Sequence, residues 1–175
     1  MRKPGRGRII AAVVSAALFS GAVILILWLK GVFLPSWIEW NKDSRDALPP
    51  GVCDMLEASW LVQDALNFDI NGDGTDEWIL LVWKRGSYGP HRPTWVKRDE
   101  IGFSQHIFIY TDRSGGDGAE DWHAIWMSSK LKFEASCFCE GSEIGGTGRN
   151  SLDITLPDGT VTRWGWLSWG LTRVD

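Results

Sequence analysis

The longest uninterrupted apolar stretch of the chain runs from residue 9 to residue 29 and reads IIAAVVSAALFSGAVILILWL, without one charged side chain. At a helical rise of about 1.5 Å per residue, this stretch matches the roughly 30 Å hydrocarbon core of a bilayer. A single segment satisfies its backbone hydrogen bonds in lipid only as a helix. The pattern therefore predicts a transmembrane helix over residues 9–29.

The charges that flank this stretch predict its orientation. Arg2, Lys3, Arg6 and Arg8 precede it, and basic residues favour the cytoplasmic side of a membrane. A cleavable signal peptide is the alternative. Its apolar region is usually only about 7–15 residues long and ends at a small-x-small site, whereas GVFLPSWIEW follows here. We therefore expect an uncleaved, single-pass signal anchor in the plasma membrane.

The composition changes after the apolar stretch. Tryptophan is mixed with polar and charged residues until Pro49, Pro50 and Gly51 interrupt regular structure. We interpret this part as an interfacial stalk that ends where a folded domain begins. The predicted organisation is a cytoplasmic tail at 1–8, a transmembrane helix at 9–29, a stalk at 30–52 and an extracytoplasmic domain at 53–175.

Beyond the stalk, short segments alternate between apolar and polar residues or run apolar, and they are rich in β-branched and aromatic side chains. Both features are typical of strands. Turn sequences such as Asn71-Gly72 and Asp158-Gly159 separate these segments. We expect a mostly β fold, an antiparallel meander that forms a small barrel, a sandwich or a partial propeller-like unit. The predicted strands are 60–68, 77–83, 103–111, 122–127, 132–139, 151–156 and 160–166.

Charge narrows the classes of partner. The whole chain has 18 Lys and Arg against 22 Asp and Glu, a net charge of −4, and five of the basic residues lie within residues 1–30. Residues 31–175 therefore carry 13 basic against 22 acidic side chains, a net charge of −9. This acidity argues against nucleic-acid binding.

The most specific local motif is Asp69-Ile70-Asn71-Gly72-Asp73-Gly74-Thr75-Asp76-Glu77, just before the apolar run WILLVW. Oxygen-bearing side chains at positions 1, 3 and 5 converge when such a loop curls around a hard cation, and a backbone carbonyl at position 7 adds an oxygen. An EF-hand would place a bidentate Glu at position 12, where this chain has Leu80. An ordinary turn is the alternative reading. The motif predicts a calcium site, with the ligands Asp69, Asn71, Asp73, Thr75 (carbonyl) and Glu77.

This D-x-N-x-D-G-x-x-E arrangement with an apolar strand on each side resembles the calcium loops of FG-GAP and VCBS-type repeats. The resemblance covers residues 60–83, one repeat, and implies bound Ca²⁺ as a cofactor. The wider sequence, with KRGSYGPHRPTWVKRD, SQHIFIY, IWMSS and WGWLSWGL, looks like uncharacterised membrane-anchored proteins of Gram-positive bacteria. That likeness implies no activity.

The chain has three cysteines, Cys53, Cys137 and Cys139. The last two are separated by one residue on a predicted strand, so their side chains share a face and are poorly placed to bond each other. In an oxidising compartment, a disulfide between Cys53 and either of them is one outcome, and three buried thiols are the other.

A second candidate site is a basic stretch in an otherwise acidic domain, within a Gly- and Pro-rich loop of the kind that often carries binding residues. It would suit an anionic envelope polymer, a lipid headgroup or an acidic protein partner; pairing with local acids is the alternative. The candidate ligand-binding residues are Lys84, Arg85, His91, Arg92, Lys97 and Arg98.

No sequence motif of a known catalytic constellation is present: the chain has no G-x-S-x-G, H-E-x-x-H or P-loop. We therefore expect a membrane-anchored binding or interaction domain with a calcium loop. Two alternatives stay open. One is a cell-envelope glycan hydrolase with acids among residues 69–77 or 117–121, and the other is an accessory subunit of a membrane complex.

Overall fold

The computed structural model describes residues 6–29, 38, 40–88, 94–98, 102–114, 119–167 and 169–175, although not the side chains of residues 6–13, 16, 27–29 and 42. The chain divides into two compact units, Met1–Ile38 and Glu39–Asp175. We describe each unit by itself.

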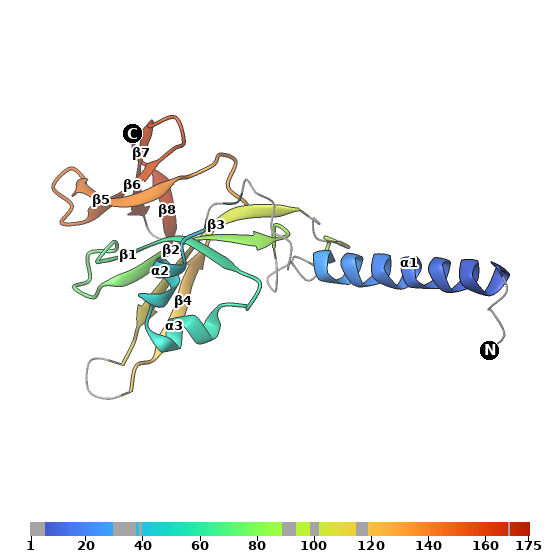
Figure 1. The fold of residues 1–175 in the computed structure, drawn as a ribbon. Helices are drawn as coiled ribbons and strands as arrows, with labels where there is room; N and C mark the ends of the chain where they lie inside the picture. Colours follow the sequence, from blue (N-terminus) through green and yellow to red (C-terminus); the bar gives the residue numbers. More distant parts are fainter. Residues whose placement is uncertain are drawn as a thin grey trace. The chain divides into compact units, whose positions relative to one another are not determined.

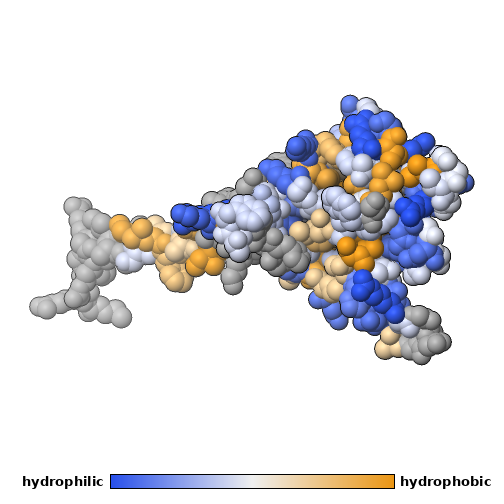
Figure 2. All heavy atoms as spheres, turned by 180° about the vertical axis from the view of Figure 1, so that it is seen from behind, coloured by the Kyte–Doolittle hydropathy of each residue, from blue (hydrophilic) through white to orange (hydrophobic). Residues whose placement is uncertain are grey.

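The first unit contains helix α1, Arg6–Leu29. The predicted helix at 9–29 is thus confirmed as a helix, while its membrane crossing stays a prediction. Within the described part of the chain, no helix is long and apolar enough to span a membrane. The described apolar side chains of α1 are exposed, with Leu18 at 70% and Phe19 at 72%. Figure 2 shows them as a mainly orange surface.

The second unit contains two four-stranded antiparallel sheets, in the orders β1-β2-β3-β4 and β5-β6-β7-β8 (Figure 1). We call them sheet A and sheet B. This confirms a mostly β fold built from antiparallel meanders, and neither sheet closes into a barrel. The strands of sheet A are β1 (Leu61–Phe68), β2 (Glu77–Arg85), β3 (Phe103–Asp112) and β4 (Trp122–Met127). The strands of sheet B are β5 (Cys137–Glu143), β6 (Asn150–Thr155), β7 (Val161–Leu167) and β8 (Gly170–Arg173).

Sheet A is covered on both faces, which explains the unbroken apolar run of β2. Successive side chains of a strand point to opposite faces. Ile79 and Leu81 join the core shared with sheet B, whereas Leu80 and Val82 join a second core. All four are fully buried. A strand that is buried on both faces needs apolar residues at every position rather than at alternate ones.

The second core of sheet A is covered by two short helices that the sequence pattern did not predict. Helix α2 is Lys42–Asp46 and helix α3 is Pro50–Met55. Leu48 and Val52, which are 6% and 0% exposed, pack against the face of sheet A that carries Leu80 and Val82. We call this the outer face of sheet A. The compact unit therefore begins before the predicted boundary at Cys53, and part of the predicted stalk covers the sheet.

The predicted strand at 132–139 is wrong in position, because β5 begins only at Cys137. The sequence from residue 131 to residue 135 does alternate, and Leu131, Phe133 and Ala135 contribute to the core between the sheets. Its backbone, however, bonds to side chains and isolated carbonyls: Ala135 N donates to Gln105 Oε1 at 2.7 Å, and Leu131 N donates to Gln105 O at 2.9 Å. The segment is a half-buried crossover from sheet A to sheet B.

Buried amides tie this crossover to sheet A. The Gln105 amide donates to Ala135 O and to Gln63 Oε1, both at 2.7 Å. Gln63 donates to Ser136 O at 2.9 Å and accepts from Trp83 Nε1 at 2.6 Å. Because buried polar groups are costly when unpaired, this network fixes the crossover against β1 and β3.

All three cysteines are free thiols. Cys53 lies on α3, and its Sγ is 3.6 Å from Arg45 O. Cys137 and Cys139 lie on β5, on the other side of sheet A from α3 (Figure 1). The structure therefore contains neither of the two disulfides that the sequence left open. The alternative of three buried thiols is also wrong, because Cys139 is exposed and the other two are only half-buried.

Candidate metal site

The 69–77 loop connects β1 to β2, and the pair Phe68 and Glu77 closes the ladder below it. Ile70 is 0% exposed and belongs to the core between the sheets, so it anchors the loop. Gly72 and Gly74 have φ angles of +77° and +88°, which residues with a Cβ rarely adopt. These features curl the loop so that its polar side chains turn inward.

The first acid of the loop organises the backbone. One carboxylate oxygen of Asp69 accepts hydrogen bonds from Gly72 N at 2.7 Å and Asp73 N at 3.2 Å. The other oxygen accepts from Gly74 N at 2.8 Å. Asp69 thus directs both of its oxygens to loop amides, which holds the turn.

Three other side chains of the motif meet at one point. Asn71 Nδ2 donates to Asp73 Oδ2 and to Glu77 Oε1, in each case at 2.9 Å. One amide therefore bridges two carboxylates whose positions are four residues apart. The structure brings together Asn71, Asp73 and Glu77 of the predicted ligand set, with Asp69 beside them and Thr75 N donating to Asp73 Oδ1 at 2.9 Å.

Glu77 is the unusual member of this group because it is 0% exposed. Its second oxygen accepts from Ile70 N at 3.1 Å, and Thr111 Oγ1 lies 3.5 Å from Oε1. Burial, with smaller contributions from the charges of Asp73 and Asp69, raises the pKa of Glu77 to about 7. A buried carboxyl among other carboxylates is stabilised by a proton or by a cation.

The donor set fits a hard cation. Carboxylate, amide and backbone carbonyl oxygens are the ligands of Ca²⁺ in proteins. Among the described residues, no group of three or more His, Cys, Asp and Glu side chains is placed to hold a metal ion. A site in this loop would therefore use no more than two carboxylates and would depend on the Thr75 carbonyl and on the Asn71 amide oxygen, which here accepts from Asp73 N at 2.8 Å.

The loop is backed by sheet B. A Cβ on Gly72 would lie 2.8 Å from Arg149 Cγ and 3.3 Å from Gly148 O, in the turn between β5 and β6. Arg149 in turn donates from Nη1 to Trp166 O at 3.1 Å. Any side chain at residue 72 would push the loop away from this turn.

The four described members of the predicted basic set differ in their surroundings, and at least one of them is not at the surface. Lys84 is 0% exposed on β2, and its Nζ donates to Gly86 O at 3.3 Å. The guanidinium of Arg85 lies 4.8 Å from the centre of the Phe103 ring. Lys97 and Arg98 are exposed. The remaining two candidates, His91 and Arg92, lie outside the described residues.

A buried Ser–His contact lies near Lys84 and was not anticipated from the sequence. Ser104 Oγ is 2.9 Å from His106 Nε2, and His106 Nδ1 is 3.2 Å from Ser128 O. Ser104 and His106 are 5% and 0% exposed, so no substrate reaches them. The sequence feature that could have indicated this contact is the polar triplet Ser104-Gln105-His106, which directly precedes the apolar run IFIY.

The other acidic segment considered for a hydrolase lies in the β3–β4 connection, of which residues 115–118 are outside the described part. Its described acids have structural partners. Glu120 accepts from Trp122 Nε1 at 2.8 Å, and Asp121 lies 3.0 Å from His123 Nε2. Each of these two described acids is therefore held by a side chain two residues away in the sequence, as expected for a structural role.

Comparisons of this chain with protein-family profiles, with curated proteins and with solved structures find no match.

Proposed function

We propose that this protein is a membrane-tethered binding domain whose 69–77 loop holds one calcium ion. The single observation that carries the proposal is the convergence of Asn71, Asp73 and the buried Glu77. A carboxylate in such a place costs free energy unless its charge is balanced, and a divalent cation balances it together with the charge of Asp73. Bound calcium would hold the loop in one conformation, so that the surface around the loop is ordered when the domain binds its partner.

The tether is the second part of the proposal. The described part of α1 exposes apolar side chains such as Leu18, Phe19 and Ile24, and a contiguous apolar surface of this kind is unfavourable in water. We propose that residues 9–29 as a whole cross the plasma membrane, with the basic N-terminus in the cytoplasm and the Glu39–Asp175 unit outside.

Calcium binding is tested by isothermal titration of the full chain in nanodiscs, at pH 8. Wild-type protein should bind one Ca²⁺ with a Kd of about 10⁻⁴–10⁻³ M, the range of extracellular sites. Asp73→Ala should abolish the signal. Asp76→Ala removes the same charge from an exposed acid of the same loop and should leave the Kd within about threefold of wild type, since nonspecific charge effects are weak at the surface.

Loss of binding in both variants, or in neither, would show that the acidic loop attracts calcium without forming a defined site.

Orientation is tested separately, because Cys139 is an exposed thiol. A membrane-impermeant maleimide should label Cys139 in cells with an intact plasma membrane, and Cys139→Ser should remove most of the label. Labelling that requires lysis would contradict the proposed orientation.

A further inference from the structure

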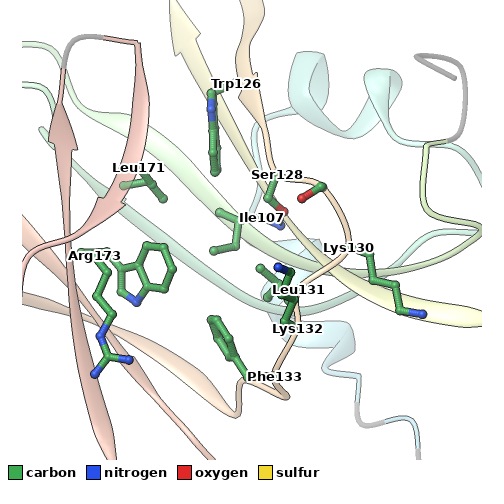
Figure 3. A pocket seen from close by; sticks show the side chains of 11 residues that line it. Ile107, Trp126, Ser128, Lys130, Leu131, Lys132, Phe133, Leu171 and Arg173 are labelled. Atoms are coloured by element: carbon green, nitrogen blue, oxygen red, sulfur yellow. Dashed lines mark hydrogen bonds between the residues drawn. The ribbon is translucent and has the colours of Figure 1, made fainter. Parts of the chain in front are cut away.

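A pocket of about 430 Å³ opens at the edge of the core between the two sheets. It lies between β3 and β4 of sheet A, the crossover segment, and β7 and β8 of sheet B, and Figure 3 shows its lining side chains. Ile107, which is 2% exposed, lies at its centre in this view. The volume falls in the range of roughly 300–1,000 Å³ that is typical of small-molecule sites.

Aromatic side chains from three different segments form the walls. Trp126 comes from β4, Phe133 from the crossover and Trp164 from β7. The rings of Phe133 and Trp164 pack with centroids 5.8 Å apart and a tilt of 37°. All three residues pack against the core between the sheets as partly buried side chains, so each is held in part by the core.

The walls are held in place by specific contacts. Trp164 Nε1 donates to Thr162 Oγ1 at 3.0 Å. Trp126 lies so close to Gly170 that a Cβ there would collide with the indole nitrogen. Because both indoles are fixed by the surrounding structure, the pocket needs little reorganisation to receive a flat molecule.

The charge of the lining has the opposite sign to that of the domain. Lys130, Lys132 and Arg173 contribute to it, and no Asp or Glu does. Lys130 and Lys132 are exposed, and Arg173 bonds Asp175 at 2.6 Å. In a segment whose net charge is −9 over residues 31–175, two lysines beside an apolar hollow favour an anion.

We propose that this pocket binds a small molecule with a flat apolar body, such as an aromatic ring system, that carries one anionic group. The ring system would lie against Trp126, Trp164 and Phe133, where offset or edge-to-face contacts are favourable. The carboxylate, sulfonate or phosphate would lie at the mouth, near Lys130 and Lys132. This inference goes beyond the proposed function and depends neither on calcium nor on the membrane tether.

The test uses the full chain in neutral-lipid nanodiscs, with empty nanodiscs as the blank. The probes are 1-naphthoate and the uncharged 1-naphthamide, which have nearly the same shape. Isothermal titration should show saturable one-to-one binding of 1-naphthoate, at least tenfold tighter than that of 1-naphthamide. No saturable binding of either probe at millimolar concentration, or equal binding of both, would overturn the proposal.

Variants separate the two parts of the ligand. Lys130→Gln/Lys132→Gln should weaken 1-naphthoate about tenfold and leave 1-naphthamide unchanged. Arg113→Glu lowers the net charge by the same two units at an exposed residue that does not line the pocket, and it should change neither affinity by more than twofold. An equal loss of 1-naphthoate binding in Arg113→Glu and in the lysine double variant would mean that long-range charge, not this pocket, attracts the anion.

Trp126→Ala should weaken both probes at least fivefold, because it removes a wall. Its melting curve, measured beside that of the lysine double variant, shows whether the domain stays folded. If a folded Trp126→Ala variant binds both probes as tightly as wild type does, the ligand lies elsewhere and the proposal fails.

Discussion

Sheet A and sheet B have the same number of strands and the same meander order, yet they are built on different principles. The central strands of sheet A are buried on both faces, and β2 has only its second and last residues half-exposed. In sheet B, the buried apolar side chains all belong to the one core that it shares with sheet A, and its first strand, β5, has four exposed positions. The number of covered faces determines the sequence pattern of a strand: a strand covered on both faces is apolar throughout, and a strand covered on one face has polar positions.

The difference also separates the two candidate sites. The 69–77 loop connects two strands of the doubly covered sheet and is anchored by the buried Ile70. The pocket lies at the edge of the core that sheet A shares with sheet B, where this core is open. We therefore regard sheet A as the stable scaffold and sheet B as the part that shapes the ligand pocket.

The largest expected effect tests whether the outer face of sheet A is a true core. Leu80→Ala removes a fully buried side chain between β2 and the helices, and should lower the free energy of unfolding by about 2–5 kcal/mol. Val161→Ala, on a position of sheet B that is 51% exposed, should change it by less than about 0.5 kcal/mol. Chemical denaturation of both variants measures the contrast, and similar values would break the comparison.

A second variant tests how firmly the two sheets are joined. Gln105→Ala leaves Ala135 N without its side-chain acceptor, while Ala135 O keeps Gln63 Nε2 as a donor at 3.1 Å. Unfolding should therefore become easier by about 1–3 kcal/mol. Hydrogen exchange should rise first in the crossover and in sheet B, because sheet A retains the core that it forms with α2 and α3. Uniform exchange across both sheets would instead indicate one cooperative unit.

A smaller effect concerns an ion pair that belongs to sheet B. Arg163 donates to both oxygens of Asp153 at 2.9 Å, and this pairing lowers the pKa of Asp153 below its usual range. The carboxylate therefore stabilises the fold above its unfolded pKa of about 3.9, and that contribution is lost as the pH falls through the lower folded value.

Asp153→Asn should cost no more than about 1 kcal/mol at pH 7, because the arginine is partly exposed. The difference between the variant and wild type should shrink below pH 4. The free energy of unfolding, measured from pH 3 to pH 7, checks both statements; a difference that stays constant with pH would rule out the ion pair as its source.

Much of this architecture can be predicted from the sequence, because the pattern of apolar and polar residues along a strand follows the burial of its side chains. Trp122–Met127 was predicted to the residue, and most other strands differ only at their ends. The pattern failed at residues 132–136 for a physical reason. Leu131, Phe133 and Ala135 do face a core, but alternation cannot show that the hydrogen-bond partner is a glutamine side chain rather than a neighbouring strand.

The sites show the same limit. The spacing of Asp69, Asn71, Asp73 and Glu77 was visible, since their partners are close in sequence. The complete burial of Glu77 was not, because it depends on how the strand is covered. The pocket was not predicted either, since Trp126, Phe133 and Trp164 come together only when the crossover joins the two sheets.

The measurement that tests the central claim most directly is the melting temperature of the full chain at pH 8, with and without about 5 mM Ca²⁺. At this pH the Glu77 carboxyl, with its pKa of about 7, is largely ionised. With a Kd of about 10⁻⁴–10⁻³ M, calcium should stabilise wild type by about 1–2.3 kcal/mol, or roughly 3–8 °C. Asp76→Ala should retain this shift and Asp73→Ala should lose it. A melting temperature that ignores calcium in all three proteins would contradict the calcium site.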